Sequence, residues 1–323
     1  MDLKQTAFKT ILLLLLVPLL VSTCNSPEKE LYLFTYFVKE KDGMYMAVSE
    51  DGLQWTPLNN NQPVLKSYVG DSLLRDPSII RDNEGQFHLV FTTSWTNLGF
   101  GYTSSTDLVN WGKQKFIPVD KGILSDGVRN AWAPEFYYES ETDEYYIIWA
   151  SAKKKIPTLK NGFKGDQKQY FIKTKDFQSF TEPALLYGGH LSDASVIDTY
   201  IVHPDDRYYF FFKFQATHFP DGGKDGVHVM SAPSLEGPYS QHQPIPNARG
   251  NSEGPTATKV GDSWIVYYDA PKGAARSTDL KNWEDISDQV AFPPGFRHGS
   301  VVALPASLIV ENFDYILQEL NTE

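Results

Sequence analysis

The chain has little cysteine and little positive charge. Only Cys24 is present among 323 residues, so no intrachain disulfide can form and the fold must be stabilised by its core. Lys and Arg number 29 against 40 Asp and Glu, which gives a net charge of −11. A nucleic-acid partner would need a basic surface, so this charge balance argues against one.

Helical patterning is also missing after the N-terminal segment. No stretch of about 10 to 15 residues keeps apolar residues at helical spacing. Instead, short aromatic and β-branched runs recur between Gly, Asp, Asn and Pro, and aromatic residues make up 14% of the chain. This pattern predicts an all-β protein.

The first residues are typical of an export signal. Lys4 and Lys9 precede an apolar run over 11–21, which is too short for a membrane span. Cys24 follows, and the stretch resembles a bacterial lipoprotein signal in which such a cysteine is lipidated, although Thr23 departs from the usual small residue. An ordinary cleaved signal is the alternative. We expect a signal peptide over 1–23, a lipidated linker over 24–30 and one folded domain over 31–323.

The rest of the chain is built from a repeated unit. Each copy reads as an acid, a short strand, a polar turn and an aromatic strand. The spacings of the leading acids are 135−76=59, 193−135=58 and 253−193=60. Repeats of this length with about four strands each are typical of a β-propeller blade. The leading acids are Asp76, Glu135, Asp193 and Glu253.

A second motif sets the number of blades at five. Turn sequences such as SEDGLQW and RSTDLKNW begin at positions 49, 104, 173, 232 and 276. The segment FRHGSVVAL, which begins at Phe296, supplies the fifth leading position with His298 and should pair with the first strands of the chain. The sequence therefore predicts a five-bladed β-propeller in which both chain ends share one blade.

Equivalent positions on five blades should meet at one end of the channel. Hydrolysis of a glycosidic bond needs a protonated carboxyl at the leaving oxygen and an ionised one that activates water or attacks the sugar. Glu253, among small residues, is the predicted acid. Asp76, beside Arg75, is the predicted base, and Asp193 would orient Glu253. Single acids of this kind often only accept backbone hydrogen bonds at turns, but turns alone do not explain the repeated set.

These motifs resemble those of family 43 glycoside hydrolases, five-bladed propellers that invert arabinofuranosides, xylosides and some galactosides. The resemblance covers nearly all of the chain after the signal. It implies that Asp76 in RDPSI is the general base, Asp193 in SDASV the pKa-modulating aspartate and Glu253 in SEGPT the general acid. It also implies that Glu135 in WAPE faces the pocket.

The resemblance also concerns the channel axis, where His298 in RHGS would lie. In some members this histidine binds calcium through water, and a neutral hydrogen-bonded histidine without metal is the alternative. Hydrolysis by two carboxyls requires no cofactor. We expect sugar contacts from Trp95, Phe100, Trp132 and His218, because aromatic faces stack on sugar rings.

The expected partner is an oligosaccharide or polysaccharide. We predict an exo-acting α-L-arabinofuranosidase that works as a monomer, with β-D-xylosidase and β-D-galactosidase as alternatives within the family. The protein should be exported as an outer-membrane or cell-surface lipoprotein, or be periplasmic, and be held at a membrane only by its lipid.

Three other functions fit parts of the sequence. A sialidase needs three arginines around a carboxylate, whereas the seven arginines of this chain are scattered. Retaining fructan hydrolases place a nucleophilic aspartate early in the first blade, and no such motif is present there. A glycan-binding lipoprotein without activity would keep the propeller and its aromatic pocket but would not need three acids.

Overall fold

The computed structural model describes residues 29–39, 41–120, 128–152, 167–187, 190–191, 194–215 and 226–313. Cys24, Asp193 and His218 lie outside these ranges. No helix in the described ranges has the length and apolar character needed to cross a membrane.

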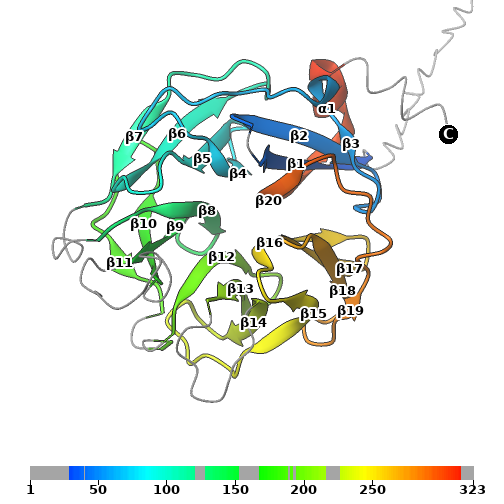
Figure 1. Cartoon of the computed structure of the whole chain (residues 1–323). Coiled ribbons are helices and arrows are strands. Elements are labelled where there is room, and N and C mark those ends of the chain that lie inside the picture. Colours follow the sequence, from blue (N-terminus) through cyan, green and yellow to red (C-terminus); the bar gives the residue numbers. More distant parts are fainter. Residues whose placement is uncertain are drawn as a thin grey trace, which may run out of the picture.

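Five four-stranded antiparallel sheets are arranged around a central axis (Figure 1). The predicted five-bladed propeller is confirmed. From the axis outward the blades contain the following strands: β20 (Phe296–Pro305), β1 (Glu30–Val38), β2 (Met44–Ser49) and β3 (Thr56–Pro57); β4 (Arg75–Arg81), β5 (Phe87–Thr92), β6 (Gly99–Ser105) and β7 (Lys115–Pro118); β8 (Trp132–Glu139), β9 (Glu144–Ala152), β10 (Gln167–Thr174) and β11 (Ala184–Leu185); β12 (Val196–Val202), β13 (Tyr208–Phe214), β14 (Gly226–Ala232) and β15 (Gln243–Arg249); β16 (Glu253–Val260), β17 (Ser263–Asp269), β18 (Gly273–Ser277) and β19 (Glu284–Asp285).

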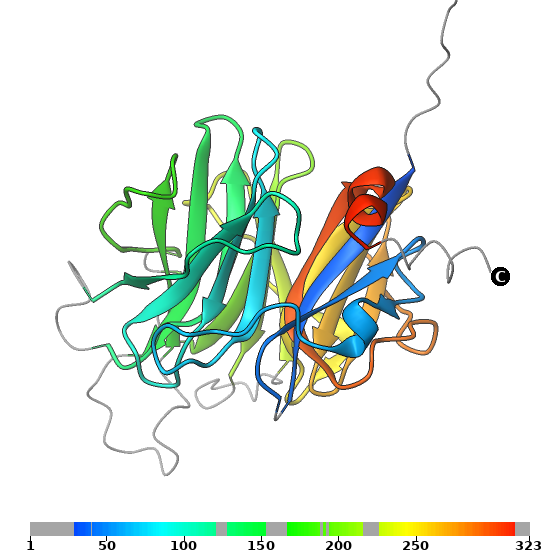
Figure 2. The ribbon, with the colours of Figure 1, turned by 90° about the horizontal axis from the view of Figure 1, so that it is seen from above.

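The ring closes through one blade made from both ends of the chain. Strand β20 pairs antiparallel with β1, so the predicted pairing of the two chain ends is confirmed. In this pairing Leu33 lies opposite Val302. Two short helical segments are also present, η1 (Asn59–Asn61) and α1 (Ala306–Asn312). Helix α1 follows β20 directly and lies beside β1 (Figure 2), and Ile309 is fully buried in the cluster that includes Leu31.

The blades are held together by apolar clusters between neighbouring sheets. Strand β13 shows the reason: nearly all of its residues are aromatic and every one of them is buried. Aromatic side chains bury large apolar areas, so packing of this kind can stabilise the ring without a disulfide.

A shared irregularity positions the site. Four inner strands change register with their neighbours near their first residues. At each of these bulges one residue has a positive φ, which redirects the side chains around it. The four residues are Asp76, Ala133, Asp198 and Gly254. In β20 the register shifts between the partners Arg297 and Gly299, so His298 is the extra residue.

Candidate active site

A pocket opens where the inner strands begin. Its volume is about 140 Å³, and residues from β1, β4, β5, β8, β12, β16 and β20 contribute to its wall. The lining residues are Phe37, Arg75, Asp76, Thr92, Trp95, Trp132, Ala133, Ile197, Asp198, Gln215, Glu253, Arg297 and His298.

Asp76 is held in the ionised form. One of its oxygens accepts a hydrogen bond from Thr92 Oγ1 at 2.8 Å, and the other lies 3.4 Å from Nδ1 of His298. Burial alone would raise the pKa of Asp76, but the hydrogen bonds from His298 and Thr92 and the charges of His298 and Arg75 outweigh it and lower the pKa. A carboxylate of this kind can accept a proton from water. Arg75 contributes to this, as the sequence suggested, but His298 contributes more.

His298 lies on the axis between carboxylates. Its Nε2 is 3.5 Å from Glu135, and its backbone N–H donates to Asp269 at 2.8 Å. Burial would lower the pKa of His298, but Asp198, Asp76 and Glu135 together raise it well above the ordinary value. The ring is therefore protonated, which differs from the neutral histidine considered from the sequence.

Glu135 lies beneath His298 and does not line the pocket. It is 1% exposed, and neither side-chain oxygen has a hydrogen-bond partner among the described residues. Burial raises its pKa, against an opposing effect of His298. The prediction that Glu135 faces the pocket is therefore wrong: the residue contacts His298, which does line the pocket.

Asp198 is the second aspartate of the pocket. Its Oδ2 accepts a hydrogen bond from the backbone N–H of Gly254 at 3.0 Å. Burial, with added repulsion from Glu253 and Asp76, raises the pKa of Asp198 to about 7 despite the opposing charge of His298. Such a group is poised to change its charge near neutral pH.

Glu253 is held between two cations. Its Oε1 accepts a hydrogen bond from Arg297 Nη2 at 2.9 Å, and its Oε2 lies 3.3 Å from Lys213 Nζ. About a third of its side chain is exposed, in the pocket wall. Its position lets it reach a ligand in the pocket while both of its oxygens stay fixed.

Arg297 connects this carboxylate to a deeper one. Its Nε donates to Asp269, whose side chain is 1% exposed. Burial raises the pKa of Asp269, while the charge of Arg297 opposes that shift. Lys213, Glu253, Arg297 and Asp269 thus form a row of alternating charges from β13 to β17.

An aromatic wall lies at the mouth of the pocket. Trp95 is 54% exposed, and Trp132 donates from its indole N–H to the backbone oxygen of Trp95 at 3.0 Å. The guanidinium of Arg75 lies over the rings of both Phe37 and Trp95, at 5.1 and 4.9 Å. Trp95 and Trp132 therefore line the pocket, and their contact with a sugar stays a prediction.

Phe100 does not share this position. It is fully buried and packs against Trp149 between two blades, so its predicted sugar contact is wrong. The alternation of β6 turns its side chain into the core.

The pocket contains an acid that the sequence analysis did not name. It is Asp198, at the bulge of β12 that corresponds to the bulge at Asp76. Asp193, the predicted orienting aspartate, lies outside the described residues, so its role stays a prediction. The signal in the sequence was an acid inside the apolar run VIDTYIV, because a carboxylate is costly to bury there without a function.

The described residues do not fit a directly bound metal ion. Among them, no three His, Cys, Asp or Glu side chains are grouped as metal ligands. Both ring nitrogens of His298 face carboxylates, at 3.4 Å from Asp76 and 3.5 Å from Glu135. Calcium bound through water stays the alternative to a metal-free histidine.

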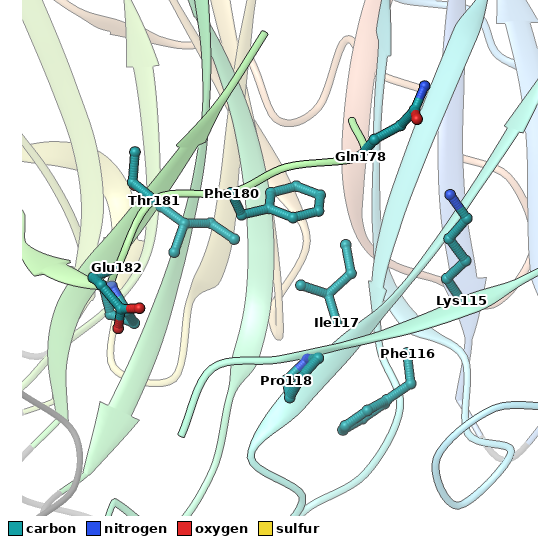
Figure 3. A pocket seen from close by; sticks show the side chains of 10 residues that line it. Lys115, Phe116, Ile117, Pro118, Gln178, Phe180, Thr181 and Glu182 are labelled. Carbon is teal, nitrogen blue, oxygen red and sulfur yellow. The ribbon is translucent and has the colours of Figure 1, made fainter. Parts of the chain in front are cut away.

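A larger cavity of about 340 Å³ lies between β7 and residues 178–183 at the rim (Figure 3). Among its lining residues Glu182 is the sole carboxylate, so this cavity has no acid and base pair. The central pocket has an ionised aspartate, an aspartate that titrates near neutral pH and a positioned glutamate, which together can perform acid and base chemistry.

Comparison with known proteins identifies the family of the chain. A family model described as a probable glycosyl hydrolase domain, of the family 43-related type, matches residues 28–307. A curated α-L-arabinofuranosidase of Bifidobacterium longum subsp. longum is 22% identical over 302 residues, which cover 85% of this chain and 27% of the relative. The chain thus spans about a quarter of that protein.

Solved structures share the fold at low identity. An α-L-arabinofuranosidase from Lactobacillus brevis has a TM-score of 0.54 at 14% identity and covers 71% of this chain and 74% of its own. An exo-1,5-α-L-arabinanase from a bovine ruminal metagenomic library has a TM-score of 0.53 at 14% identity, with coverage of 77% and 89%. The family match extends over most of the chain, so the protein belongs to the glycosyl hydrolase 43-related family.

Proposed function

We propose that the protein is an inverting, exo-acting α-L-arabinofuranosidase that releases arabinose from plant-type glycans. The observation that carries the hydrolytic part is that an ionised Asp76 and a glutamate held by two cations, Glu253, line the same pocket. The sugar is proposed from the family resemblance and from the names of the related proteins. β-D-Xylosidase and β-D-galactosidase activities are the alternatives within the same chemistry.

In this mechanism Asp76 takes a proton from the water that attacks the anomeric carbon. Glu253 gives a proton to the glycosidic oxygen as the bond to that carbon breaks. Asp198 accepts a hydrogen bond from the backbone N–H of Gly254, the residue after Glu253, and so holds the backbone that carries the acid. Trp95 and Trp132 would stack on the sugar at the mouth of the pocket.

The size of the pocket supports exo action. A volume of about 140 Å³ suits one sugar ring better than a longer chain. We therefore propose that a terminal residue enters the pocket and the rest of an oligosaccharide or polysaccharide stays outside.

We also propose that the protein is a monomer exported as a lipoprotein through Cys24, on the outer membrane, the cell surface or in the periplasm. The support is the N-terminal sequence alone. Labelled palmitate incorporated into the full chain, and lost in Cys24→Ala, would test this proposal. Equal labelling of both proteins would contradict it.

The function is tested by turnover of 4-nitrophenyl α-L-arabinofuranoside, β-D-xyloside, β-D-galactoside and α-sialoside by protein lacking residues 1–24. Glu253→Gln and Asp76→Asn are assayed beside it. The proposal expects arabinofuranoside turnover that both substitutions lower by at least about 100-fold, and the inverted anomer as the first product seen by NMR. Wild-type turnover that survives both changes would exclude the mechanism. Polysaccharide binding without turnover of any linkage would favour the glycan-binding alternative.

A further inference from the structure

Lys213 is a cation within an aromatic strand. The sequence of β13 is YYFFFKF, and Lys213 is 5% exposed. Its Nζ donates to the backbone oxygen of Asn251 at 2.9 Å and to Oε2 of Glu253 at 3.3 Å. Strand β13 and strand β16, which begins at Glu253, belong to neighbouring blades (Figure 1). The contact between Lys213 and Glu253 therefore crosses the boundary between two blades.

Stability alone does not explain this lysine. Removing an ammonium group from water costs several kcal/mol, which its attraction to a carboxylate offsets only with good geometry. An apolar side chain of similar length at such a position is often neutral or stabilising. The blade boundary already contains a cluster of buried apolar residues from β13 and β17, so the ion pair is not needed to join the two blades.

The two cations at Glu253 have different positions. Arg297 lines the pocket and is held by Asp269. Lys213 does not line the pocket and is held by the backbone oxygen of Asn251. One oxygen of the carboxylate therefore contacts a cation in the pocket wall, and the other contacts a cation outside it.

We propose that Lys213 is a positioning residue for acid catalysis, which fixes Glu253 and stabilises the carboxylate that forms when Glu253 gives up its proton. The proposal rests on the proposed function of the same site. In the reaction, the proton moves from Glu253 to the glycosidic oxygen, which keeps the electron pair of the broken bond. Water bonds to the anomeric carbon and loses its proton to Asp76. Lys213 keeps its own protons throughout.

This role makes a specific prediction about leaving groups. In a 2,4-dinitrophenyl glycoside the leaving group is a stable anion, so cleavage needs little help from an acid. In a 4-methoxyphenyl glycoside the leaving group is a poor one, so cleavage needs the proton that Glu253 donates. A residue that acts through Glu253 should therefore matter for the second substrate and hardly for the first. A purely structural residue would affect both equally.

The experiment compares kcat/KM for these two α-L-arabinofuranosides in the wild type, Lys213→Met and Lys213→Arg. If the panel identifies another sugar, the aryl glycosides of that sugar are used. Wild-type turnover of the dinitrophenyl glycoside reports on the proposed function, and only the ratio between the two substrates reports on Lys213. We expect Lys213→Met to lose about tenfold or more on the methoxyphenyl glycoside and less than about twofold on the dinitrophenyl one. Lys213→Arg should recover part of the loss.

The matched control is Lys173→Met. Lys173 pairs with Glu144 at 2.9 Å, does not line the pocket and has no contact with Glu253. Lys173→Met should leave kcat/KM unchanged for both aryl glycosides. Equal losses of Lys213→Met on both substrates, or no loss on either, would overturn the proposal.

Discussion

At the scale of single residues, the site depends on how one histidine and five carboxyl groups share charge. The protonated ring of His298 lies among Asp76, Glu135 and Asp198, and Arg297 and Lys213 flank Glu253. Burial raises the pKa of Asp198 and Asp269, whereas hydrogen bonds lower that of Asp76. The separation of these values gives the carboxyl groups different roles.

Asp198 should make the protein less stable as pH rises. Its pKa is about 7 in the folded protein against an ordinary 3.8, so between these values the folded state binds more protons than the unfolded state. Stability then falls as pH increases through this window. In Asp198→Asn the decrease in melting temperature from pH 4 to 7 should be smaller than in the wild type, as measured by calorimetry. An unchanged slope would contradict the raised pKa.

Gly254 should not tolerate a side chain. Its φ is +61°, and an added Cβ would lie 2.4 Å from the ring of His298. Gly254→Ala should therefore displace His298, lower the free energy of unfolding by about 2 kcal/mol or more and reduce activity strongly. Gly250→Ala is the control, because Gly250 has a similar φ of +66° but nothing within 4 Å of an added Cβ. Gly250→Ala should lower the free energy of unfolding by about 1 kcal/mol, without loss of activity. Equal effects would show that backbone strain alone is responsible.

At the scale of elements, the repeated turn motif has a clear structural basis. In four copies an aspartate accepts backbone N–H groups two and three residues later, and the residue after it has a positive φ. The four aspartates are Asp51, Asp107, Asp176 and Asp279. The fifth copy differs, because a serine hydrogen bond to Gly237 closes its turn. Each of these turns connects the third and fourth strands of its blade, and none of the four aspartates lines the pocket.

Asp107→Ala should destabilise its blade by about 1 to 2 kcal/mol, because four hydrogen bonds are lost. Hydrogen bonds lower the pKa of Asp107 to about 2, so its contribution should be full above the ordinary value and fade as pH falls towards 2. Urea unfolding at pH 7 and pH 2.5 measures this. Asp262→Ala, at an exposed turn residue, is the control and should have little effect. A difference that persists unchanged at pH 2.5 would contradict the explanation.

The elements of the fold could be predicted from the sequence. The repeat identified all five blades and the closing strand, because turn residues and aromatic strands recur along the chain. It could not identify Asp198, because a bulge adds a residue to each inner strand and shifts which side chain faces the axis. Glu253 precedes its bulge residue and Glu135 follows its own, so acids at regular spacing do not occupy equivalent places. Lys213 and Arg297 were missed because their partners lie in other blades.

At the scale of the whole molecule, the channel axis is occupied by the protonated His298 among carboxylates. We therefore predict that incubation with EDTA leaves both the melting temperature and the activity of the protein unchanged. Both quantities are measured before and after dialysis against chelator, with calcium added back as the control. A fall of either quantity that calcium restores would establish the water-mediated calcium site that the family resemblance implied.

The ring geometry brings three acids from three blades to one pocket. The most direct test compares kcat/KM for four variants on the best substrate. We predict that Asp76→Asn, Asp198→Asn and Glu253→Gln each lower kcat/KM by at least about 100-fold, while Asp193→Asn stays near the wild type. A large loss in Asp193→Asn together with an active Asp198→Asn would contradict the site described by the structure.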